Sequence, residues 1–262
     1  MSVISDAASH GAPVELERLD GAVVVVTLSR HAERNALSRD VLEALFEALE
    51  VAATGARAMV LTGGPDVFCA GGDLGFLHRA LAAGNHAEVR ETLFLLVDVV
   101  RRLRALPMPT IAAVEGLAVG AGLALAFGAD IRIAGRRASF IPGYLAVGAS
   151  PDGGVSHHLV RALGSSQALA ALVLNKRLSS EELLATGLVQ EVVDDGAALE
   201  RAVTVARGLT ELSPDALLVT RKVLDTASTL GFDAQLEAEA EAFGLLLDTP
   251  AFREAIAKYG GA

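Results

Sequence analysis

The sequence has a single cysteine and no tryptophan, and aromatic residues make up only 4% of it. The lone cysteine, Cys69, excludes a disulfide within the chain and a zinc site built from several thiolates, and it fits a reducing compartment. No uninterrupted apolar run reaches the ~18 residues that a membrane-spanning helix needs. The N-terminal residues lack a basic segment followed by an apolar one. We therefore expect no secretory signal and a cytoplasmic protein.

Basic residues are also scarce relative to acidic ones. The 22 Lys and Arg residues face 32 Asp and Glu residues, which gives a formal net charge of -10. Binding to nucleic acid needs clustered Lys and Arg, and the densest basic run, at 101–104, is more typical of a solvated helix end. We therefore expect neither nucleic acid nor membrane as a partner. The 262 residues, 52% of them hydrophobic, are enough for one large globular domain.

Segments typical of strands alternate with segments typical of helices. β-branched and apolar runs predict buried strands at 21–29, 56–64, 110–116, 130–135, 138–141 and 188–194. Apolar residues at helical spacing predict helices at 39–53, 87–106 and 118–129. Ser38 is a candidate N-cap for the first helix, and Pro107 ends the second. Nearly everything from Gly153 onward is helical in pattern. This alternation predicts an α/β core with crossover connections, followed by a helical C-terminal region.

Two glycine-rich clusters, at 71–72 and 116–122, each follow a predicted strand; the first precedes residues that read as a helix start, and the second opens the helix predicted at 118–129. Free backbone N–H groups at a helix start carry partial positive charge and favour an anion or a developing oxyanion. A dinucleotide-binding fingerprint is disfavoured, because Gly120 and Gly122 are followed by Leu125 where Gly or Ala is needed. Tight packing of helix on sheet is the plain alternative. Together, the two turns can direct one N–H each at a single oxygen, as in an oxyanion hole.

Five segments carry a family resemblance: "RNALS" (34–38), "FCAGGDL" (68–74), "VEGLAVGAGLALAFGADIRIA" (114–134), "RLSSEELLATGLVQEVV" (177–193) and "FREAIAKY" (252–259). In combination they resemble the crotonase superfamily, the enoyl-CoA hydratase/isomerase family. The resemblance implies a crotonase-like α/β spiral of ββα units over residues 13–200, after an N-terminal tail at 1–12. It also implies that helices at 201–262 assemble homotrimers, often paired into homohexamers. The implied ligand is an acyl-CoA thioester, with coenzyme A as part of the substrate and no separate cofactor or metal.

The resemblance assigns the backbone N–H groups of Gly72 and Ala121 to the thioester oxygen. On this assignment, Gly71 and Gly72 let the backbone approach the thioester without a Cβ in the way, and Asp73 caps the next helix. Cys69 is expected to pack as a small apolar residue. Such donors stabilise an enolate more than the ground state, by roughly 3–4 kcal/mol each. The residues expected to contact substrate or coenzyme A are Arg34, Asn35, Ala36, Ala70, Gly72, Asp73, Leu74, Gly120, Tyr144 and, from a neighbouring subunit, Tyr259.

The sequence departs from the hydratases of this family at both catalytic glutamates. The resemblance places these two carboxylates at Ala124 and Tyr144. Neither alanine nor a tyrosine with an ordinary pKa near 10 can replace a carboxylate base. A dehalogenase branch of the family would need a histidine at the position of Val97. We therefore expect neither simple hydration of an enoyl-CoA nor hydrolytic dehalogenation.

One acid remains at an informative place, since Asp152 lies four residues after Gly148. Branches that resemble ring-opening phenylacetyl-CoA isomerases and dienoyl-CoA isomerases have a catalytic aspartate there, and one carboxylate can serve as base and then as acid. Burial is expected to raise its pKa. The alternative is that Asp152 only caps a helix that begins at Gly153; His157 and His158 are expected in surface or packing roles. The sequence thus predicts an enoyl-CoA isomerase, with a weakly active hydratase or a non-catalytic acyl-CoA binder as alternatives.

Overall fold

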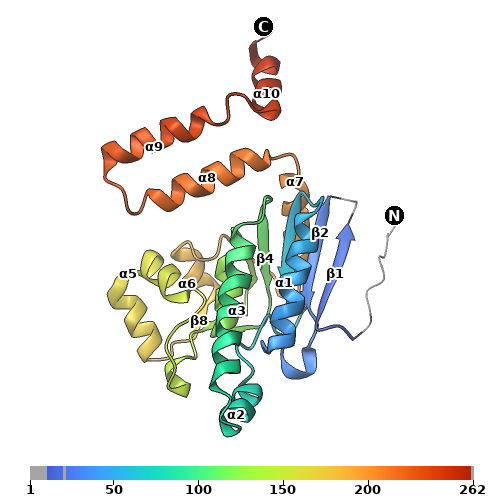
Figure 1. Ribbon diagram of the computed structural model, residues 1–262, viewed down its shortest axis with the longest axis vertical. Coiled ribbons are helices and arrows are strands. Elements are labelled where there is room, and N and C mark those ends of the chain that lie inside the picture. The colour runs from blue at the N-terminus through green and yellow to red at the C-terminus, as the bar shows by residue number, and fades with distance from the viewer. Residues whose placement is uncertain (1–10, 20–21, 261–262) are drawn as a thin grey trace. The chain divides into compact units, whose positions relative to one another are not determined.

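The computed structural model describes residues 11–19 and 22–260, and its larger sheet is mixed, with both parallel and antiparallel strands (Figure 1). Within these residues, the six strands of this sheet have the order β1-β2-β3-β4-β6-β9. They are β1 (Val14–Leu19), β2 (Val23–Leu28), β3 (Ala58–Thr62), β4 (Thr110–Val114), β6 (Ile131–Gly135) and β9 (Glu191–Val193). β1 is antiparallel to β2, and every other neighbouring pair is parallel. β3 and β4 are buried throughout, as parallel strands covered on both faces usually are.

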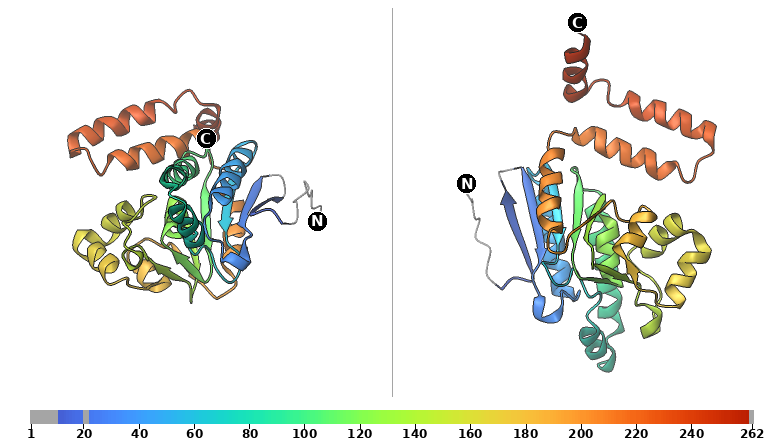
Figure 2. Two further views of the ribbon diagram at one scale, coloured as in Figure 1. Left: turned by 60° about the horizontal axis from the view of Figure 1, so that its bottom comes forward. Right: turned by 180° about the vertical axis from the view of Figure 1, so that it is seen from behind.

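Helices cover both faces of this sheet, and the alternation of side chains along β2 shows how. Val24 and Val26 belong to the same apolar cluster as α1 (Arg39–Ala53) and α3 (His86–Arg104). The neighbouring valines of β2 point to the opposite face, which α7 (Ala198–Leu209) covers with alanines at every fourth position. The views in Figures 1 and 2 show α1 and α3 on one face and α7 on the other. The valine run of β2 is therefore buried from both sides.

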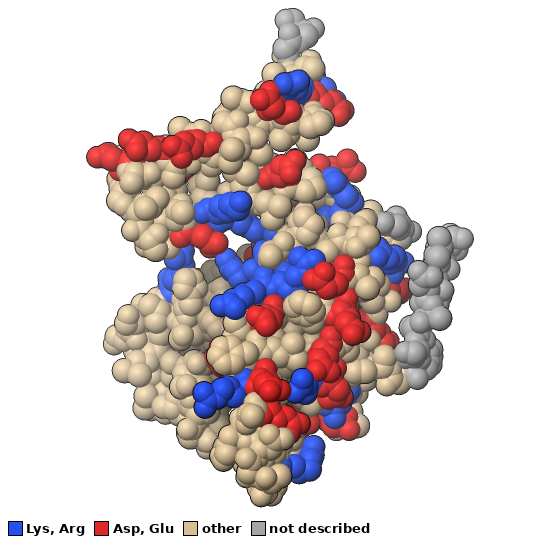
Figure 3. Space-filling model, viewed as in Figure 1, with Lys and Arg blue, Asp and Glu red and all other residues tan. Residues whose placement is uncertain are grey.

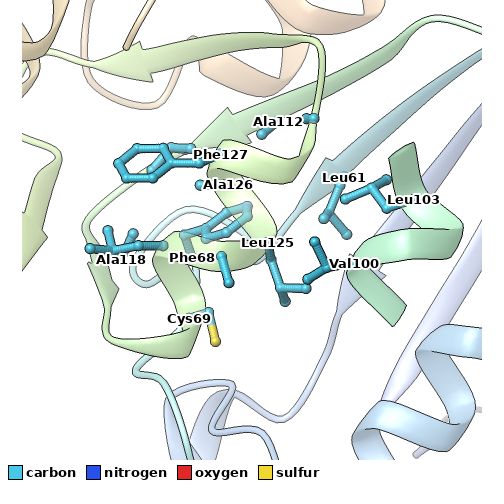
Figure 4. Packing of buried hydrophobic residues seen from close by; sticks show 14 of the residues in the cluster. Leu61, Phe68, Cys69, Val100, Leu103, Ala112, Ala118, Leu125, Ala126 and Phe127 are labelled. Carbon is cyan, nitrogen blue, oxygen red and sulfur yellow. The ribbon is translucent and has the colours of Figure 1, made fainter. Parts of the chain in front are cut away.

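A smaller sheet carries the second glycine-rich turn. Within the described residues it consists of β5 (Leu117–Val119), β7 (Ser139–Ile141) and β8 (Leu178–Ser179). The helix that follows β5, α4 (Ala121–Gly128), is buried at every position, which explains why its sequence is apolar all round. Figure 4 shows Leu125 of α4 in the apolar cluster together with Val100 and Leu103 of α3. This packing fixes the start of α4, where the predicted site lies.

The remaining helices complete two compact units, residues 1–210 and 211–262. The first unit also holds η1 (His31–Glu33), α2 (Leu74–Ala82), η2 (Leu145–Val147), α5 (Val155–Val173) and α6 (Ser180–Ala185). The second contains α8 (Pro214–Thr226), α9 (Phe232–Gly244) and α10 (Pro250–Gly260). The boundary between the two units follows α7, whereas the sequence placed it at residues 200–201, near the start of α7. α7 belongs to the first unit because it covers the main sheet. The expected tail at 1–12 lies almost wholly outside the described residues.

Charged side chains of both signs are interspersed on the face shown in Figure 3. The basic run at 101–104 forms the last turn of α3, as predicted for a helix end, where cations also interact favourably with the helix dipole. Arg102 pairs with Glu50, and Arg101 lies 3.5 Å from Asp98. Among the described helices, none is both long enough and apolar enough to cross a membrane.

Candidate active site

A cavity of about 620 Å³ in the first unit collects most of the residues that the sequence assigned to the site. Its wall is built from the turn before α2, the turn between β5 and α4, one face of α3 and the segment at 143–152. The predicted residues that line it are Ala70, Gly72, Asp73, Leu74, Gly120, Ala121, Tyr144 and Asp152. The fold therefore brings both glycine-rich turns and the single candidate acid to one place.

The backbone N–H groups of Gly72 and Ala121 are not used by the fold. Leu37 bridges to Gly72, but the two hydrogen bonds of this bridge run from the Leu37 N–H to the Gly71 oxygen (2.7 Å) and from the Asp73 N–H to the Leu37 oxygen (3.1 Å). Ala121 is the first residue of α4, where N–H groups have no acceptor within the helix. In the described part of the chain neither group donates to a protein atom. Both are thus available to an oxygen in the cavity.

Close packing holds the two turns together. The Val119 N–H donates to the Cys69 oxygen (2.9 Å), and the Cys69 N–H donates to the Leu117 oxygen (3.0 Å). A Cβ on Gly122 would lie 2.5 Å from the Cys69 oxygen, so glycine is required there for α4 to approach the first turn. Cys69 is fully buried, and burial raises the pKa of its thiol to about 12. The predicted packing role of Cys69 is confirmed.

The two glycines of the first turn differ in what they leave room for. Gly71 has φ +90°, and a Cβ there would lie 2.6 Å from the Val119 oxygen. The prediction that Gly71 leaves room for a thioester is therefore wrong: its missing Cβ leaves room for the neighbouring strand. A Cβ on Gly72 would meet no protein atom within 4 Å. Asp73 caps α2 by accepting a hydrogen bond from the Phe76 N–H (2.8 Å), which confirms the predicted cap.

Asp152 and Tyr144 form a hydrogen-bonded pair in the cavity wall. The Tyr144 hydroxyl donates to Oδ1 of Asp152 at 2.9 Å, and the tyrosine is only 6% exposed. Burial raises the pKa of Asp152 above its ordinary value of 3.8, as predicted, although the Tyr144 hydrogen bond acts in the opposite direction. Burial and the nearby Asp152 carboxylate also raise the pKa of Tyr144, so the phenol stays protonated and remains a donor. One oxygen of Asp152 is thus held in place by Tyr144.

The alternative role of Asp152 as a helix cap is wrong. α5 begins at Val155, its N-cap residue is Gly154, and no side chain caps it. Gly153 and Gly154 both have positive φ, +52° and +86°, so a left-handed turn separates Asp152 from the helix. The carboxylate is therefore not engaged by the helix start and can act in the cavity.

Ala124 is fully buried in α4 and does not line the cavity. A Cβ on Gly153 would lie only 2.4 Å from the Cβ of Ala124, so the turn that carries Asp152 lies directly against this alanine. A glutamate at position 124 would have no room unless that turn moved away. A small side chain at position 124 is therefore required for the turn at Gly153 to hold Asp152 where it lies.

Four predicted contact residues do not line the cavity: Arg34, Asn35, Ala36 and Tyr259. Asn35 is buried and connects its own loop to the segment at 63–67, because its side-chain amide donates to the backbone oxygens of Gly63 (2.8 Å) and Val67 (2.8 Å). Arg34 is exposed outside the cavity. Tyr259 belongs to the second unit, where it is 85% exposed. Contact of these residues with coenzyme A stays a prediction.

Sequence reasoning missed the apolar walls of the cavity. They come mainly from Leu37, Leu42, Phe76, Leu77, Val89, Leu93, Leu96 and Val119. The α3 members recur at helical spacing, which was visible in the sequence, but nothing there showed that this face of α3 meets the cavity.

The histidines after Asp152 lie outside the cavity, as predicted. His157 is exposed, and His158 packs at 5.8 Å from the ring of Phe127, where burial lowers its pKa to about 4. Across residues 11–19 and 22–260, no group of three or more His, Cys, Asp or Glu side chains is arranged to hold a metal ion.

Known proteins share this fold and these segments. Residues 18–260 match the family model described as enoyl-CoA hydratase/isomerase. The 2,3-dehydroadipyl-CoA hydratase of Escherichia coli (strain K12) is 32% identical over 90% of this chain and 91% of its own length. The 1,2-epoxyphenylacetyl-CoA isomerase of the same organism is 31% identical over 93% and 94%. A crystal structure of an enoyl-CoA hydratase from Polaromonas sp. JS666 superposes with a TM-score of 0.87, at 35% identity, over 95% of this chain and 96% of that one.

Two unused backbone N–H groups beside a half-buried carboxylate are suited to stabilising an oxyanion such as an enolate. The chain belongs to the enoyl-CoA hydratase/isomerase family, the crotonase superfamily. The α/β fold that the resemblance implied is confirmed.

Proposed function

We propose that this protein is an enoyl-CoA isomerase, which moves a double bond along an acyl-CoA thioester. One observation carries the proposal: Asp152 is the only carboxylate in the wall of the cavity that does not cap a helix. The other acid in the wall, Asp73, accepts from the Phe76 N–H and lies 3.8 Å from Arg30. Proton chemistry in this cavity therefore depends on Asp152.

The reaction follows from the placement of these groups. The thioester oxygen of a β,γ-enoyl-CoA accepts hydrogen bonds from the Gly72 and Ala121 N–H groups. The Asp152 carboxylate removes a proton from the α-carbon, and the electron pair of that C–H bond moves into a dienolate. The two donors stabilise the charge on oxygen by roughly 3–4 kcal/mol each. Protonated Asp152 then returns the proton to the γ-carbon, which leaves an α,β double bond.

This cycle needs one mobile proton and no water, whereas hydration needs an activated water as well. Position 124 holds a buried alanine that cannot direct water, and position 144 holds a phenol kept protonated by burial. Relatives named for both reactions are equally similar, at 31% identity for a 1,2-epoxyphenylacetyl-CoA isomerase and 32% for a 2,3-dehydroadipyl-CoA hydratase. The choice of an isomerase therefore rests on the residues at positions 124 and 144 and on Asp152.

We also propose that the protein assembles as a trimer or hexamer through its second unit. That unit leaves many large apolar side chains exposed: Leu224, Phe232, Leu236, Phe243, Leu245, Leu247 and Ile256. In α8 no residue is buried. Exposed apolar area on this scale marks an interaction surface in soluble proteins.

The proposal is tested with 3-hexenoyl-CoA and 2-hexenoyl-CoA as substrates. The wild-type protein should convert the β,γ isomer into the conjugated thioester, followed by absorbance and chromatography. Asp152→Asn should lower this rate by at least ~10²-fold. Asp194→Asn is the matched control, because Asp194 has a side chain that is 94% exposed, and its rate should equal that of the wild type. Hydration of 2-hexenoyl-CoA without double-bond migration, or binding without turnover, would overturn the proposal.

A further inference from the structure

We infer that the cavity accepts an uncharged, apolar acyl group and rejects an acyl chain that ends in a second carboxylate. This inference rests on the proposed function and specifies its substrate class. The thioester must lie at the Gly72 and Ala121 N–H groups, so its acyl chain runs along the walls around them. Those walls are apolar on the side of α2 and α3, where they consist of Leu74, Phe76, Leu77, Val89, Leu93 and Leu96.

The charges in the wall have only one sign. Among the wall residues, all of which lie in the described part of the chain, the only charged side chains are Asp73 and Asp152. No lysine, arginine or histidine lines the cavity. Arg30, which contacts Asp73 of the wall, is already engaged: it lies 3.8 Å from Asp73 and donates to the Ser38 hydroxyl at 2.7 Å.

The polar atoms in the wall offer no substitute for a cation. Thr92 is buried, and its hydroxyl donates to the Glu88 oxygen at 2.9 Å. The Tyr144 hydroxyl donates to Asp152. Both donors are therefore already used by acceptors of the protein itself. The third hydroxyl in the wall, that of Ser150, is neutral and cannot balance a full negative charge.

A terminal carboxylate would thus leave water for an apolar surface without an opposite charge, and it would approach two carboxylates. Unpaired burial of a charge is strongly unfavourable, and like charges add to it. A hydrophobic pocket prefers an apolar substrate to the analogue that carries one added hydroxyl by roughly 10²-fold. A full negative charge should be rejected at least that strongly. A methyl-ended or aromatic acyl group meets no such penalty.

The test uses two thioesters of equal chain length, 3-hexenoyl-CoA and the mono-CoA thioester of 3-hexenedioic acid, which differ only in a terminal methyl or carboxylate. We expect kcat/KM to be at least ~10²-fold higher for the methyl-ended substrate. Equal values, or a preference for the diacid thioester, would overturn the inference. Binding of hexanoyl-CoA and adipyl-CoA is measured beside it and should show the same preference. If neither substrate is isomerised, the proposed function fails, while the binding pair still decides the acyl preference.

A gain of function gives a second, independent readout. Leu93 lines the cavity and is 47% exposed, so Leu93→Arg can place a cation in the wall while its stem stays on the apolar surface. The preference for the methyl-ended thioester should fall by at least ~10-fold in kcat/KM and in binding. Phe94→Arg is the matched control: it adds the same charge one residue along α3, outside the cavity, and should leave the preference unchanged. Leu74→Arg replaces Leu93→Arg if the latter does not fold. An unchanged preference in a folded cavity-wall variant, or an equal change in Phe94→Arg, would contradict the inference.

Discussion

The pair formed by Tyr144 and Asp152 predicts a defined effect of removing one hydroxyl. Tyr144→Phe keeps the ring, which is 6% exposed, and deletes only the donor that lies 2.9 Å from Oδ1 of Asp152. That hydrogen bond holds one carboxylate oxygen, so the other is presented to the substrate. Tyr144 therefore acts as a positioning residue through Asp152.

The magnitude follows from the strength of a hydrogen bond to a charged group, about 1.5–3 kcal/mol. Because the bond fixes the orientation in which the carboxylate meets the α-carbon, its loss should lower kcat, by about 10- to 100-fold if that strength is lost in full in the transition state. KM should change little, because the apolar contact of the ring remains.

The pH dependence has a definite sign. Asp152 must be ionised to act as the base, so activity falls as pH decreases through its pKa, which burial raises above 3.8. The Tyr144 hydrogen bond lowers that pKa, so its removal should move the acid limb of kcat/KM to higher pH. The assay is isomerisation of 3-hexenoyl-CoA across pH for both proteins. An unchanged acid limb together with an unchanged kcat would show that Tyr144 is only a packing residue.

Three substitutions test the two glycines of the first turn and the hydratase position, and one solution measurement tests the assembly. Gly72→Pro deletes one N–H that the fold does not use and should reduce turnover by at least ~10²-fold; normal turnover in the folded variant would refute the assignment. Gly71→Ala should lower the free energy of unfolding by about 2 kcal/mol in denaturant titration, because φ is +90° and the Cβ meets the Val119 oxygen; a stability equal to the wild type would contradict this packing. Ala124→Glu should lower it by at least ~3 kcal/mol and give no hydratase activity, since a carboxylate is buried against Gly153; hydration by this variant would disprove that reasoning. Light scattering at micromolar concentration should give a trimer or hexamer, and a monomer would refute the proposed assembly.

The main sheet was predictable where apolar runs were long. The valine run of β2 and the buried run of β3 predict their strands, because parallel strands covered on both faces are apolar at nearly every position. β1 was missed because it is an edge strand, with glutamates and an arginine between its apolar residues. The helix predicted at 118–129 was wrong at its start, where Ala118 and Val119 belong to β5 and α4 begins only at Ala121. β5 and β8, with three and two residues, are too short to show a period.

The site was predictable only as far as local sequence fixes it. The glycine turns and the missing carboxylates are local features, and the structure brings these turns to the same cavity as Asp152. Whether Asp152 caps a helix depended on the left-handed turn at Gly153 and Gly154, which delays α5 to Val155. Ser38 shows the same limit: it occupies the N-cap position of α1, but its hydroxyl is bound to Arg30 and Asp40 instead of capping.

The stability of Asp152→Asn decides whether its loss of activity can be interpreted. Because burial raises the pKa of Asp152 in the folded protein, the folded state holds this proton more tightly than the unfolded state does. Ionisation of Asp152 therefore lowers the free energy of unfolding. This loss of stability is absent at a pH below the ordinary pKa of 3.8 and complete at a pH above the raised pKa of the folded protein. Asparagine carries no charge and can still accept from Tyr144. At neutral pH this variant should be at least as stable as the wild type, and the difference should shrink as pH falls.

Hydrogen exchange into a bound acyl-CoA tests the central claim most directly. Wild-type protein and Asp152→Asn are incubated with 3-hexenoyl-CoA in deuterated water, and deuterium at the α- and γ-carbons is measured by NMR and mass spectrometry. If Asp152 moves the proton, the wild type isomerises the substrate and incorporates deuterium to the extent that protonated Asp152 exchanges with the solvent before it gives up its proton, while the folded asparagine variant does neither. Full exchange and isomerisation by Asp152→Asn would contradict the role of Asp152 as the mobile acid and base.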